Sequence, residues 1–288
     1  MNVLIVGCGD LGLRVARLLL ADPGNSVWAV RRHPPRDIAI QGLRWIAADL
    51  ARPETLDTLP TGITHLVYLA APDSRTEADY RAVYRAGIEH VLDALPPNGC
   101  QRVIFISSTA VYGDHGDAWV DEDTPLDPPA FNGRILQETE TWLADRAALS
   151  GGHLVATCLR LSGIYGPGRT FLLERLRTGR APAPAGAGHW ANRVHADDAA
   201  RAIGHVLTLP SPAPVYLVTD DTPLPIRTLY EDLARLVGGP VPPVGPAPAG
   251  MGNKRLSNAR LRATGFRFEW SDSREGHAAL LRVDQAGG

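Results

Sequence analysis

The sequence predicts an α/β protein in which a doubly wound parallel sheet is followed by a smaller C-terminal lobe. Short apolar runs alternate with segments of helical spacing over the first 165 residues, which is typical of a parallel sheet. The runs are apolar or β-branched almost throughout, as expected of strands that are buried on both faces. A glycine-rich turn also joins the first run to the first helical segment, and such turns bind phosphates in this fold class.

The elements follow in a regular order. Strands are expected at residues 3–6, 27–30, 43–47, 65–70, 102–107 and 153–160. A first helix at 11–21 ends at a strong stop signal, the Asp-Pro-Gly-Asn sequence of residues 22–25. Helical patterns also cover 77–94 and begin within "DPPAFNGRILQETETWL" (127–143), which enters through two prolines. A later helix is expected at 198–207, with Asp197 as its N-cap.

The chain changes character near residue 165. Residues 1–165 form the expected dinucleotide-binding domain, to which 192–220 return, and 166–288 form the expected substrate lobe. Residues 179–190 read as a loop. The segment 239–250 is rich in proline and glycine, which predicts a flexible connection or lid.

Composition narrows the function classes. The chain has 288 residues, 44% of them hydrophobic, and a net charge of −2, which argues against nucleic acid or an anionic membrane as a partner. No stretch approaches the ~20 apolar residues of a membrane span, and no signal peptide is evident, so we expect a cytoplasmic protein. Cys8, Cys100 and Cys158 are scattered, which favours reduced structural thiols. The histidines lack metal-ligand spacing, so no metal is expected.

The turn after the first strand has the form of a dinucleotide-binding loop. It carries Gly7-x-Gly9-x-x-Gly12 between a strand and a helix, which is the context that gives this pattern its meaning. Gly7 allows the tight turn, Gly9 lets the backbone approach a pyrophosphate, and Gly12 lets the helix pack on the strand. Asp10 and Leu11 complete the loop, where the helix N-terminus presents free N–H groups and a positive dipole.

The end of the second strand indicates which nucleotide is bound. A carboxylate about 20 residues beyond the glycines would bond the ribose 2′-hydroxyl of NAD. This chain has Arg31 and Arg32 there instead, and guanidinium groups bond a 2′-phosphate. We therefore expect NADP as the cofactor, with NAD less favoured. The alternative is that one of the two arginines is simply solvated.

An ordered set of motifs extends over nearly the whole chain. Besides the glycine loop, it comprises "ADL" (48–50), "YLAAP" (68–72), "ISSTAVYG" (106–113), "LRLSGIYGPGR" (159–169) and "NRVHADDAARAI" (192–203). With these motifs the chain resembles an extended short-chain dehydrogenase/reductase (SDR) of the NAD-dependent epimerase/dehydratase type, a Rossmann-fold oxidoreductase family.

The resemblance implies roles for particular residues. Asp49 and Leu50 would flank the adenine, and Ala70 and Ala71 would line the cofactor beyond the fourth strand. Ser108 matches the catalytic Ser/Thr of the family. Tyr112 belongs to a structural turn in that family, so it is not a candidate catalyst.

The chain departs from the family at its catalytic helix. Active members carry Y-x-x-x-K, in which the tyrosine exchanges a proton with the substrate and the lysine lowers the pKa of the phenol. The alignment places Asn132 and Leu136 at these two positions, and the only lysine in the chain is Lys254. Neither replacement exchanges a proton at neutral pH. The chain thus resembles an atypical subgroup whose helix carries a pattern like "GRIL" (133–136).

Further departures concern the substrate. Nucleotide-sugar members have an arginine four residues before the histidine of "VH-x-x-D", where this chain has Ala191. Arg193 would point elsewhere, and His195 and Asp197 read as structural. Tyr165 and Arg169 have the spacing of Y-x-x-x-K, but the proline and glycine between them indicate a loop. Lys254 and Arg255 could reach an anionic substrate, although a solvated rim is the favoured interpretation.

Three hypotheses follow. The first is an NADP-dependent oxidoreductase or epimerase/dehydratase acting on a small molecule, with Ser108 orienting the substrate. The second is a non-catalytic NADP-binding sensor or scaffold, which the residues Asn132 and Leu136 favour. The third, an interaction protein without a dinucleotide, would leave the glycines and the arginine pair without a role. The resemblance also implies a possible homodimer through the helices near 80–95 and 132–147.

Overall fold

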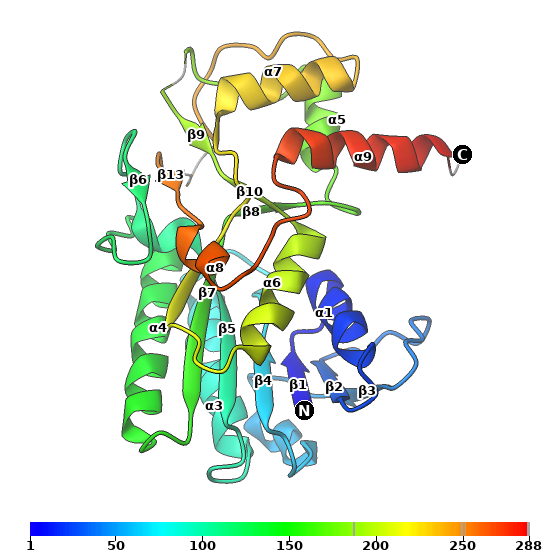
Figure 1. The fold of residues 1–288 in the computed structure, drawn as a ribbon, viewed down its shortest axis with the longest axis vertical. Coiled ribbons are helices and arrows are strands. Elements are labelled where there is room, and N and C mark those ends of the chain that lie inside the picture. The colour runs from blue at the N-terminus through cyan, green and yellow to red at the C-terminus, as the bar shows by residue number, and fades with distance from the viewer. Residues whose placement is uncertain (187, 249, 251, 287–288) are drawn as a thin grey trace. The chain divides into compact units, whose positions relative to one another are not determined.

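A computed structural model describes residues 1–186, 188–248, 250 and 252–286. The chain divides into two compact units, both discontinuous in sequence. Unit 1 comprises Met1–Ser108, Pro128–Leu159 and Ala200–Val215, and unit 2 comprises Thr109–Asp127, Arg160–Ala199 and Tyr216–Gly288. Figure 1 labels the helices and strands.

The central sheet has seven strands in the order β11-β7-β5-β4-β1-β2-β3. The ladders that join β3, β2, β1, β4 and β5 are all parallel, which confirms the expected fold class. All four residues from Val3 to Val6 are fully buried, as an apolar run in a sheet covered on both faces should be. The strands are β1 (Asn2–Val6), β2 (Ser26–Arg31), β3 (Leu43–Ala47), β4 (His65–Tyr68), β5 (Arg102–Ser108), β7 (Val155–Leu161) and β11 (Val215–Val218).

The order of the strands creates a switch point between β1 and β4. From β1 the chain proceeds to β2 and β3 on one side, whereas β4, β5, β7 and β11 lie on the other. Doubly wound sheets bind ligands beyond the carboxyl ends of the strands at such a point. The segments that follow β1 and β4 are therefore the ones to examine for a cofactor site.

The helices associated with the sheet have apolar faces. In α1 the buried side chains recur at helical spacing, which places Leu11, Val15 and Leu19 on one face. The helices are α1 (Asp10–Leu20), α2 (Glu77–Tyr80), α3 (Gly87–Ala94), α4 (Phe131–Leu149) and α6 (Ala196–Thr208), with short 3₁₀ turns at Pro53–Thr58 and Thr109–Tyr112.

The helical segment expected at 77–94 is present but contains a π-helical turn at Arg81–Ala86 between α2 and α3. The Tyr68 hydroxyl, from β4, donates a hydrogen bond to the Val83 carbonyl at 2.5 Å. A Cβ atom on Gly87 would lie 2.5 Å from the same hydroxyl. A side chain that inserts into the helical ladder is a usual cause of such a turn. The phenol therefore explains both the π turn and the glycine that follows it.

Unit 2 contains short paired strands and helices. The strand pairs are β8 with β10 and β6 with β13, both parallel, and β9 with β12, antiparallel. One apolar core joins α5 and α7 through Leu173, Leu176, Leu229 and Leu233. The elements are β6 (Trp119–Val120), β8 (Gly163–Tyr165), α5 (Phe171–Arg177), β9 (Trp190–Ala191), β10 (Arg193–His195), β12 (Leu224–Pro225), α7 (Ile226–Leu236), β13 (Arg255–Leu256), α8 (Ala259–Ala263) and α9 (Ser273–Ala286).

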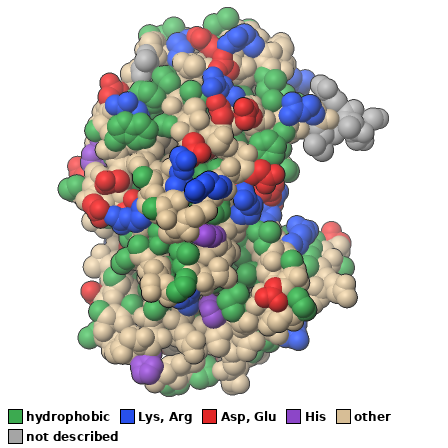
Figure 2. Space-filling model, viewed as in Figure 1, with side chains coloured by type: hydrophobic (Ala, Val, Ile, Leu, Met, Phe, Trp, Pro, Cys, Tyr) green, Lys and Arg blue, Asp and Glu red, His purple; other side chains and the backbone are tan. Residues whose placement is uncertain are grey.

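On the face shown in Figure 2, basic and acidic side chains are interspersed. Among the described residues, none of the helices combines the length and the apolar character that crossing a bilayer requires.

Candidate functional site

The glycine turn lies at the switch point of the sheet. β1 ends at Val6, α1 begins at Asp10, and Gly7 between them has a φ of +80°. A Cβ atom on Gly7 would overlap the backbone N and Cα of Ala70 and lie 2.8 Å from the carbonyl carbon of Leu69. Only glycine fits this conformation and this close approach. The approach also places Ala70, which the resemblance assigns to the cofactor, directly beside the turn.

The other two glycines play different parts. Gly9 is the N-cap of α1, and a Cβ atom there would meet nothing within 4 Å. A Cβ atom on Gly12 would lie 3.1 Å from Cys8 Sγ and 3.3 Å from Ile5 Cγ2, so this glycine lets α1 pack on β1. Gly7 and Gly12 are thus packed closely against neighbouring residues, whereas Gly9 faces open space. That arrangement suits a phosphate at the helix N-terminus.

The two arginines of the NADP prediction differ in their surroundings. Arg31 is the last residue of β2, is exposed, and forms no hydrogen bond or ion pair with any residue that the structure describes. The carbonyl of Val30, the residue before Arg31, accepts hydrogen bonds from the Gly7 and Cys8 amides at 3.1 and 3.2 Å, so the end of β2 lies at the glycine turn. Burial raises the pKa of the Cys8 thiol to about 12, and the charge of Arg31 acts in the opposite direction. Arg32 instead pairs with Asp73. That hydrogen bond, with the charge of Asp73, raises the pKa of Arg32.

The residues expected around the adenine lie after β3. Asp49 is partly buried, and its Oδ1 accepts a hydrogen bond from the Ala51 amide at 3.0 Å. Its own amide donates to Thr55 Oγ1 at 2.9 Å. The Leu50 carbonyl lies 2.8 Å from His90 Nδ1. One oxygen of Asp49 is therefore engaged in the turn. Ala71, after β4, is exposed.

The face of α4 that carries the departure from the family is fixed by an acid that sequence reasoning missed. Asn132, Leu136 and Glu140 recur every four residues and so share one face. Glu140 is buried, and Ser107 of β5 donates a hydrogen bond to its Oε1 at 2.5 Å. This bond directs the face toward the end of β5, where Ser108 lies. The helical spacing from Leu136 to Glu140 is the signal that could have revealed it.

Neither Asn132 nor Leu136, at the positions of the family's tyrosine and lysine, has a side chain that exchanges a proton at neutral pH. Leu136 is 3% exposed. Asn132 is partly buried, and its carboxamide has no hydrogen-bond partner among the described residues. This amide can donate to or accept from a ligand, but it cannot exchange a proton at neutral pH. Ser108, at the end of β5, is partly buried.

The tyrosines near the motifs are held by structural contacts within unit 2. Tyr112 is fully buried, and its hydroxyl accepts a hydrogen bond from Arg160 Nη1 at 2.6 Å. Tyr165 ends β8 and is stacked on His277 with a ring separation of 4.2 Å. Both arrangements fit the structural roles expected for these residues.

Two expectations are wrong. Asp197 is not an N-cap, because α6 begins at Ala196 and the Asp197 amide donates to His195 Nδ1 at 3.2 Å. Lys254 is not part of a solvated rim, since it is 4% exposed and donates to the carbonyl oxygens of Gly113 and Gly252 at 2.8 and 3.2 Å. Burial lowers the pKa of Lys254 to about 8.

Arg255, beside the buried lysine, packs against aromatic side chains. Its guanidinium carbon lies 5.2 Å from the centre of the Trp119 ring and 4.9 Å from that of Trp190. Its Nε donates to the Asp117 carbonyl at 2.7 Å. These contacts, with the pairing of β13 and β6, hold β13 against the strand that carries Trp119.

Known proteins match the chain over most of its length. The model of the NAD dependent epimerase/dehydratase family matches residues 3–218. Protein YeeZ of Escherichia coli is 29% identical over 282 residues, covering 94% of this chain and 97% of its own. The 2′-dehydrokanamycin reductase of Streptomyces kanamyceticus is 30% identical over 285 residues, covering 93% and 76%.

A solved structure has the same fold. It is described as a putative NAD-dependent epimerase/dehydratase from Methylobacillus flagellatus and is 37% identical, with a TM-score of 0.80 and coverage of 99% and 98% of the two chains.

A parallel sheet with a glycine turn at its switch point defines a protein of the Rossmann type. The extent of the family match places this chain more closely: it belongs to the NAD dependent epimerase/dehydratase family. The resemblance inferred from the motifs is thereby confirmed. The family and the relatives support an NAD(P)-dependent, oxidoreductase-like role.

Proposed function

We propose that the protein is an NADP-dependent oxidoreductase that acts on a small carbonyl or hydroxyl compound. The observation that carries this proposal is Arg31, an exposed guanidinium with no partner among the described residues, at the end of β2 and near the glycine turn. A guanidinium in this place suits a 2′-phosphate. The reductase activity named for the Streptomyces kanamyceticus relative agrees with the proposed class of reaction.

Arg31 and Arg32 contribute unequally in this proposal. Arg32 is already paired with Asp73, so binding a phosphate would require it to exchange one anion for another. Arg31 has no such competitor among the described residues. We therefore assign the discrimination between NADP and NAD to Arg31 and a smaller, supporting effect to Arg32.

The residues of unit 1 suggest how the reaction is arranged. When bound, NADP supplies or accepts a hydride. The Ser108 hydroxyl orients the substrate oxygen, and the unpaired carboxamide of Asn132 hydrogen-bonds a ribose or a ligand carbonyl. Leu136 keeps the nicotinamide end dry. Because none of these groups exchanges a proton at neutral pH, the proton comes from water or from a group outside the usual pair.

Nucleotide binding tests the cofactor assignment directly. Calorimetry on the wild type should give a lower Kd for NADP than for NAD. Arg31→Gln should weaken NADP binding roughly ten- to a hundredfold, since it removes a charge-assisted bond worth about 1.5–3 kcal/mol, and should leave NAD binding unchanged. Arg32→Gln is the matched comparison and should have a smaller effect. Equal affinity of the wild type for the two nucleotides would refute the NADP assignment.

A second function, a non-catalytic NADP-binding sensor or scaffold, is favoured by Asn132 and Leu136. The two are separated by NADPH oxidation across a panel of small aldehydes, ketones and keto acids. An enzyme turns over at least one compound and loses that activity in Ser108→Ala. A sensor binds NADP without turnover, and its function is indifferent to Ser108→Ala. If the double variant Asn132→Tyr, Leu136→Lys gains reductase activity, the pocket still admits a substrate.

A further inference from the structure

Arg193 lies on a two-stranded ribbon within unit 2. The register of β10 with β8 pairs Arg193 with Gly163 and His195 with Tyr165. Because side chains alternate along a strand, Arg193 and His195 share one face of this ribbon with Tyr165. The rings of Tyr165 and His195 confirm this arrangement, with centroids 5.1 Å apart.

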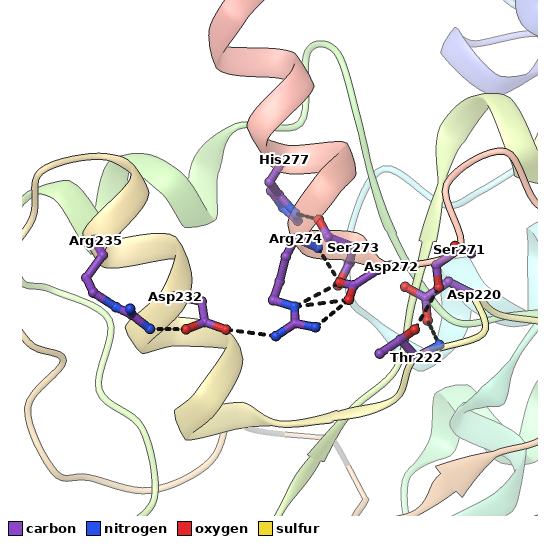
Figure 3. Close-up of polar contacts among 9 residues, drawn as sticks. All are labelled: Asp220, Thr222, Asp232, Arg235, Ser271, Asp272, Ser273, Arg274 and His277. Atoms are coloured by element: carbon purple, nitrogen blue, oxygen red, sulfur yellow. Dashed lines mark hydrogen bonds and ion pairs between the residues drawn. The ribbon is translucent and has the colours of Figure 1, made fainter.

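One end of this face is covered and the other is not. Tyr165 stacks on His277 of α9, and His195 lies 5.1 Å from the Trp270 ring. Figure 3 shows His277 on the first turns of α9, where its Nδ1 lies 2.6 Å from the Ser273 carbonyl. His195 and His277 are only 3% and 2% exposed, whereas Arg193 is partly exposed. The guanidinium of Arg193 is thus at the accessible end of a buried row.

The guanidinium of Arg193 packs over Gly163 and has no acceptor among the described residues. Its Nε is buried without a hydrogen-bond partner, and its side chain forms no hydrogen bond or ion pair with any residue in the described part of the chain. A Cβ atom on Gly163 would overlap Arg193 Nη1, so the missing side chain of this glycine provides the room. A partly buried guanidinium that lacks an acceptor is energetically costly unless a ligand supplies one.

The carboxyl group of Asp220, a neighbour of Arg193, forms no hydrogen bond or ion pair with this guanidinium in the described structure. The Asp220 amide donates to the Arg193 carbonyl at 2.7 Å, but the carboxyl of Asp220 is 1% exposed and its Oδ2 has no partner. Burial raises the pKa of Asp220 to about 8 even though the charge of Arg193 opposes this shift. Burial also lowers the pKa of His277 to about 4. Burial thus favours the uncharged form of both groups.

The carboxyl groups of Asp198, Asp272 and Glu275 also act on Tyr165 in this row. Asp272 accepts hydrogen bonds from Arg274 Nε and Nη2 at 2.5–3.1 Å, as Figure 3 shows, so its charge is already matched. Burial raises the pKa of Tyr165, which keeps its hydroxyl protonated, and this hydroxyl has no partner. The row thus contains a hydroxyl and a guanidinium Nε that lack hydrogen-bond partners among the described residues.

We propose that unit 2 contains an anion site in which the guanidinium of Arg193, lying over Gly163, binds the carboxylate or phosphate of a small molecule. The anion site itself does not depend on the proposed function. Identifying its ligand as the substrate does rest on that function, and it narrows the substrate class to anionic compounds.

The direct test uses the full chain saturated with NADP, so that sites for the cofactor phosphates are filled. Inorganic phosphate and a set of short hydroxy and oxo acids are titrated at constant ionic strength, with the corresponding carboxamides as neutral controls, and the midpoint of thermal unfolding is followed. Any ligand specific to the folded state raises that midpoint. We expect saturable stabilisation by at least one anion and none by its carboxamide. Phosphate alone would indicate a phosphorylated ligand, and an acid alone a carboxylate.

Variants locate the effect. Arg193→Gln should weaken anion binding about tenfold or more, as the loss of a charge-assisted hydrogen bond requires. Gly163→Ala keeps the charge but displaces the guanidinium, and it should weaken binding as well. Arg193→Lys should bind the anion more tightly than Arg193→Gln, because it keeps a positive charge. It should bind more weakly than the wild type, because an ammonium lacks the planar fork of a guanidinium. Arg177→Gln, which removes an exposed guanidinium from α5, is the matched control and should bind like the wild type.

The outcomes separate this proposal from the proposed function. No saturable anion binding by the wild type, or equal losses in Arg193→Gln and Arg177→Gln, would overturn the anion site. If Arg193→Gln does not fold, Gly163→Ala and Arg193→Lys still decide the matter. Arg193-dependent binding without turnover of any compound would uphold the site and refute the oxidoreductase. Turnover with the same kcat/KM for an acid and its carboxamide would uphold the oxidoreductase and refute an anionic substrate.

Discussion

The two units of the protein bury different kinds of side chain. In the described part of unit 1, Glu140 is the only buried residue with a carboxylate, ammonium, guanidinium or imidazole group, and the interior is otherwise made of apolar strands and helix faces. Unit 2 buries one such group after another: Arg160, His195, Asp198, Asp220, Lys254 and His277.

This difference shows how each unit is stabilised. Unit 1 relies on the shape of an apolar sheet, so close contacts such as that of Gly7 with Ala70 are its sensitive points. Unit 2 relies on buried polar groups that satisfy distant backbone atoms. The carboxylate of Asp198, for example, accepts hydrogen bonds from the amides of Glu269 and Trp270 at 3.0 and 2.8 Å. Buried polar groups stabilise only when they are paired.

The largest expected effect tests the role of shape in unit 1. Gly7→Ala places a Cβ against Ala70 at a positive φ, which should lower the free energy of unfolding by about 2–4 kcal/mol and abolish NADP binding. Gly9→Ala is the matched control, because its Cβ meets nothing in the protein. It should unfold within about 0.5 kcal/mol of the wild type while binding NADP more weakly.

Urea unfolding of the cofactor-free protein and NADP calorimetry measure these effects. If Gly7→Ala were as stable as Gly9→Ala, the contact between the turn and Ala70 would not be a sensitive point. The contrast between the units would then lose its main support in unit 1.

The next effect concerns a buried acid of unit 2. In the unfolded chain an aspartate releases its proton near pH 4, whereas burial raises the pKa of Asp220 to about 8 in the folded protein. Between these values the folded chain holds one proton more, so rising pH lowers the free energy of unfolding by up to about 1.4 kcal/mol per pH unit. Asp220→Asn mimics the protonated acid and should remove this contribution.

Urea unfolding of both proteins between pH 5 and 8 tests this expectation. The difference in unfolding free energy, wild type minus Asp220→Asn, should fall as the pH rises. Asp123→Asn, at a position whose side chain is 79% exposed, serves as the control and should give no such slope. Parallel pH profiles for the wild type and Asp220→Asn would contradict the burial of a protonated carboxyl.

Much of unit 1 could be predicted from the sequence because its signals are local. The apolar runs predicted the bounds of the central strands to within about two residues. The spacing of the glycines predicted the turn between β1 and α1. The π-helical turn in the 77–94 segment could not be predicted, because its cause is the Tyr68 hydroxyl from β4. Likewise, the difference between Arg31 and Arg32 depends on Asp73, some forty residues away.

Less of the structure of unit 2 could be predicted from the sequence, because this unit depends on polar contacts between residues that are far apart in the chain. Lys254 is buried since the segment around it bonds to two other loops: Asn253 to the Gly188 carbonyl and to the Trp190 amide, and Lys254 to Gly113. No periodicity marks such contacts. Asp197 has the residue type of an N-cap, yet the ring of His195 takes the acceptor role there.

A smaller effect tests the buried lysine. Lys254→Met keeps the length of the side chain but leaves the carbonyl oxygens of Gly113 and Gly252 without this donor. The loss should lower the free energy of unfolding by about 1–2 kcal/mol at pH 7, because the gain from removing a buried charge offsets part of it. Thermal and urea unfolding measure the change. A variant more stable than the wild type would show that Lys254 is retained for function rather than for the fold.

The smallest expected effect separates a bidentate ion pair from a single exposed contact within unit 2. Arg235 and Arg274 both bind Asp232, as Figure 3 shows. The Arg235 side chain is 78% exposed and makes this single contact with Asp232. The Arg274 side chain also forms a bidentate ion pair with Asp272. Arg235→Gln should change the free energy of unfolding by less than about 0.5 kcal/mol, as is usual for an exposed ion pair. Arg274→Gln should cost more, up to about 1 kcal/mol, because a bidentate pair is better ordered. Urea unfolding at low and high salt distinguishes them, since salt screens the exposed pair more strongly. Equal losses in the two variants would mean that the bidentate geometry of the Arg274 pair adds no stability to unit 2.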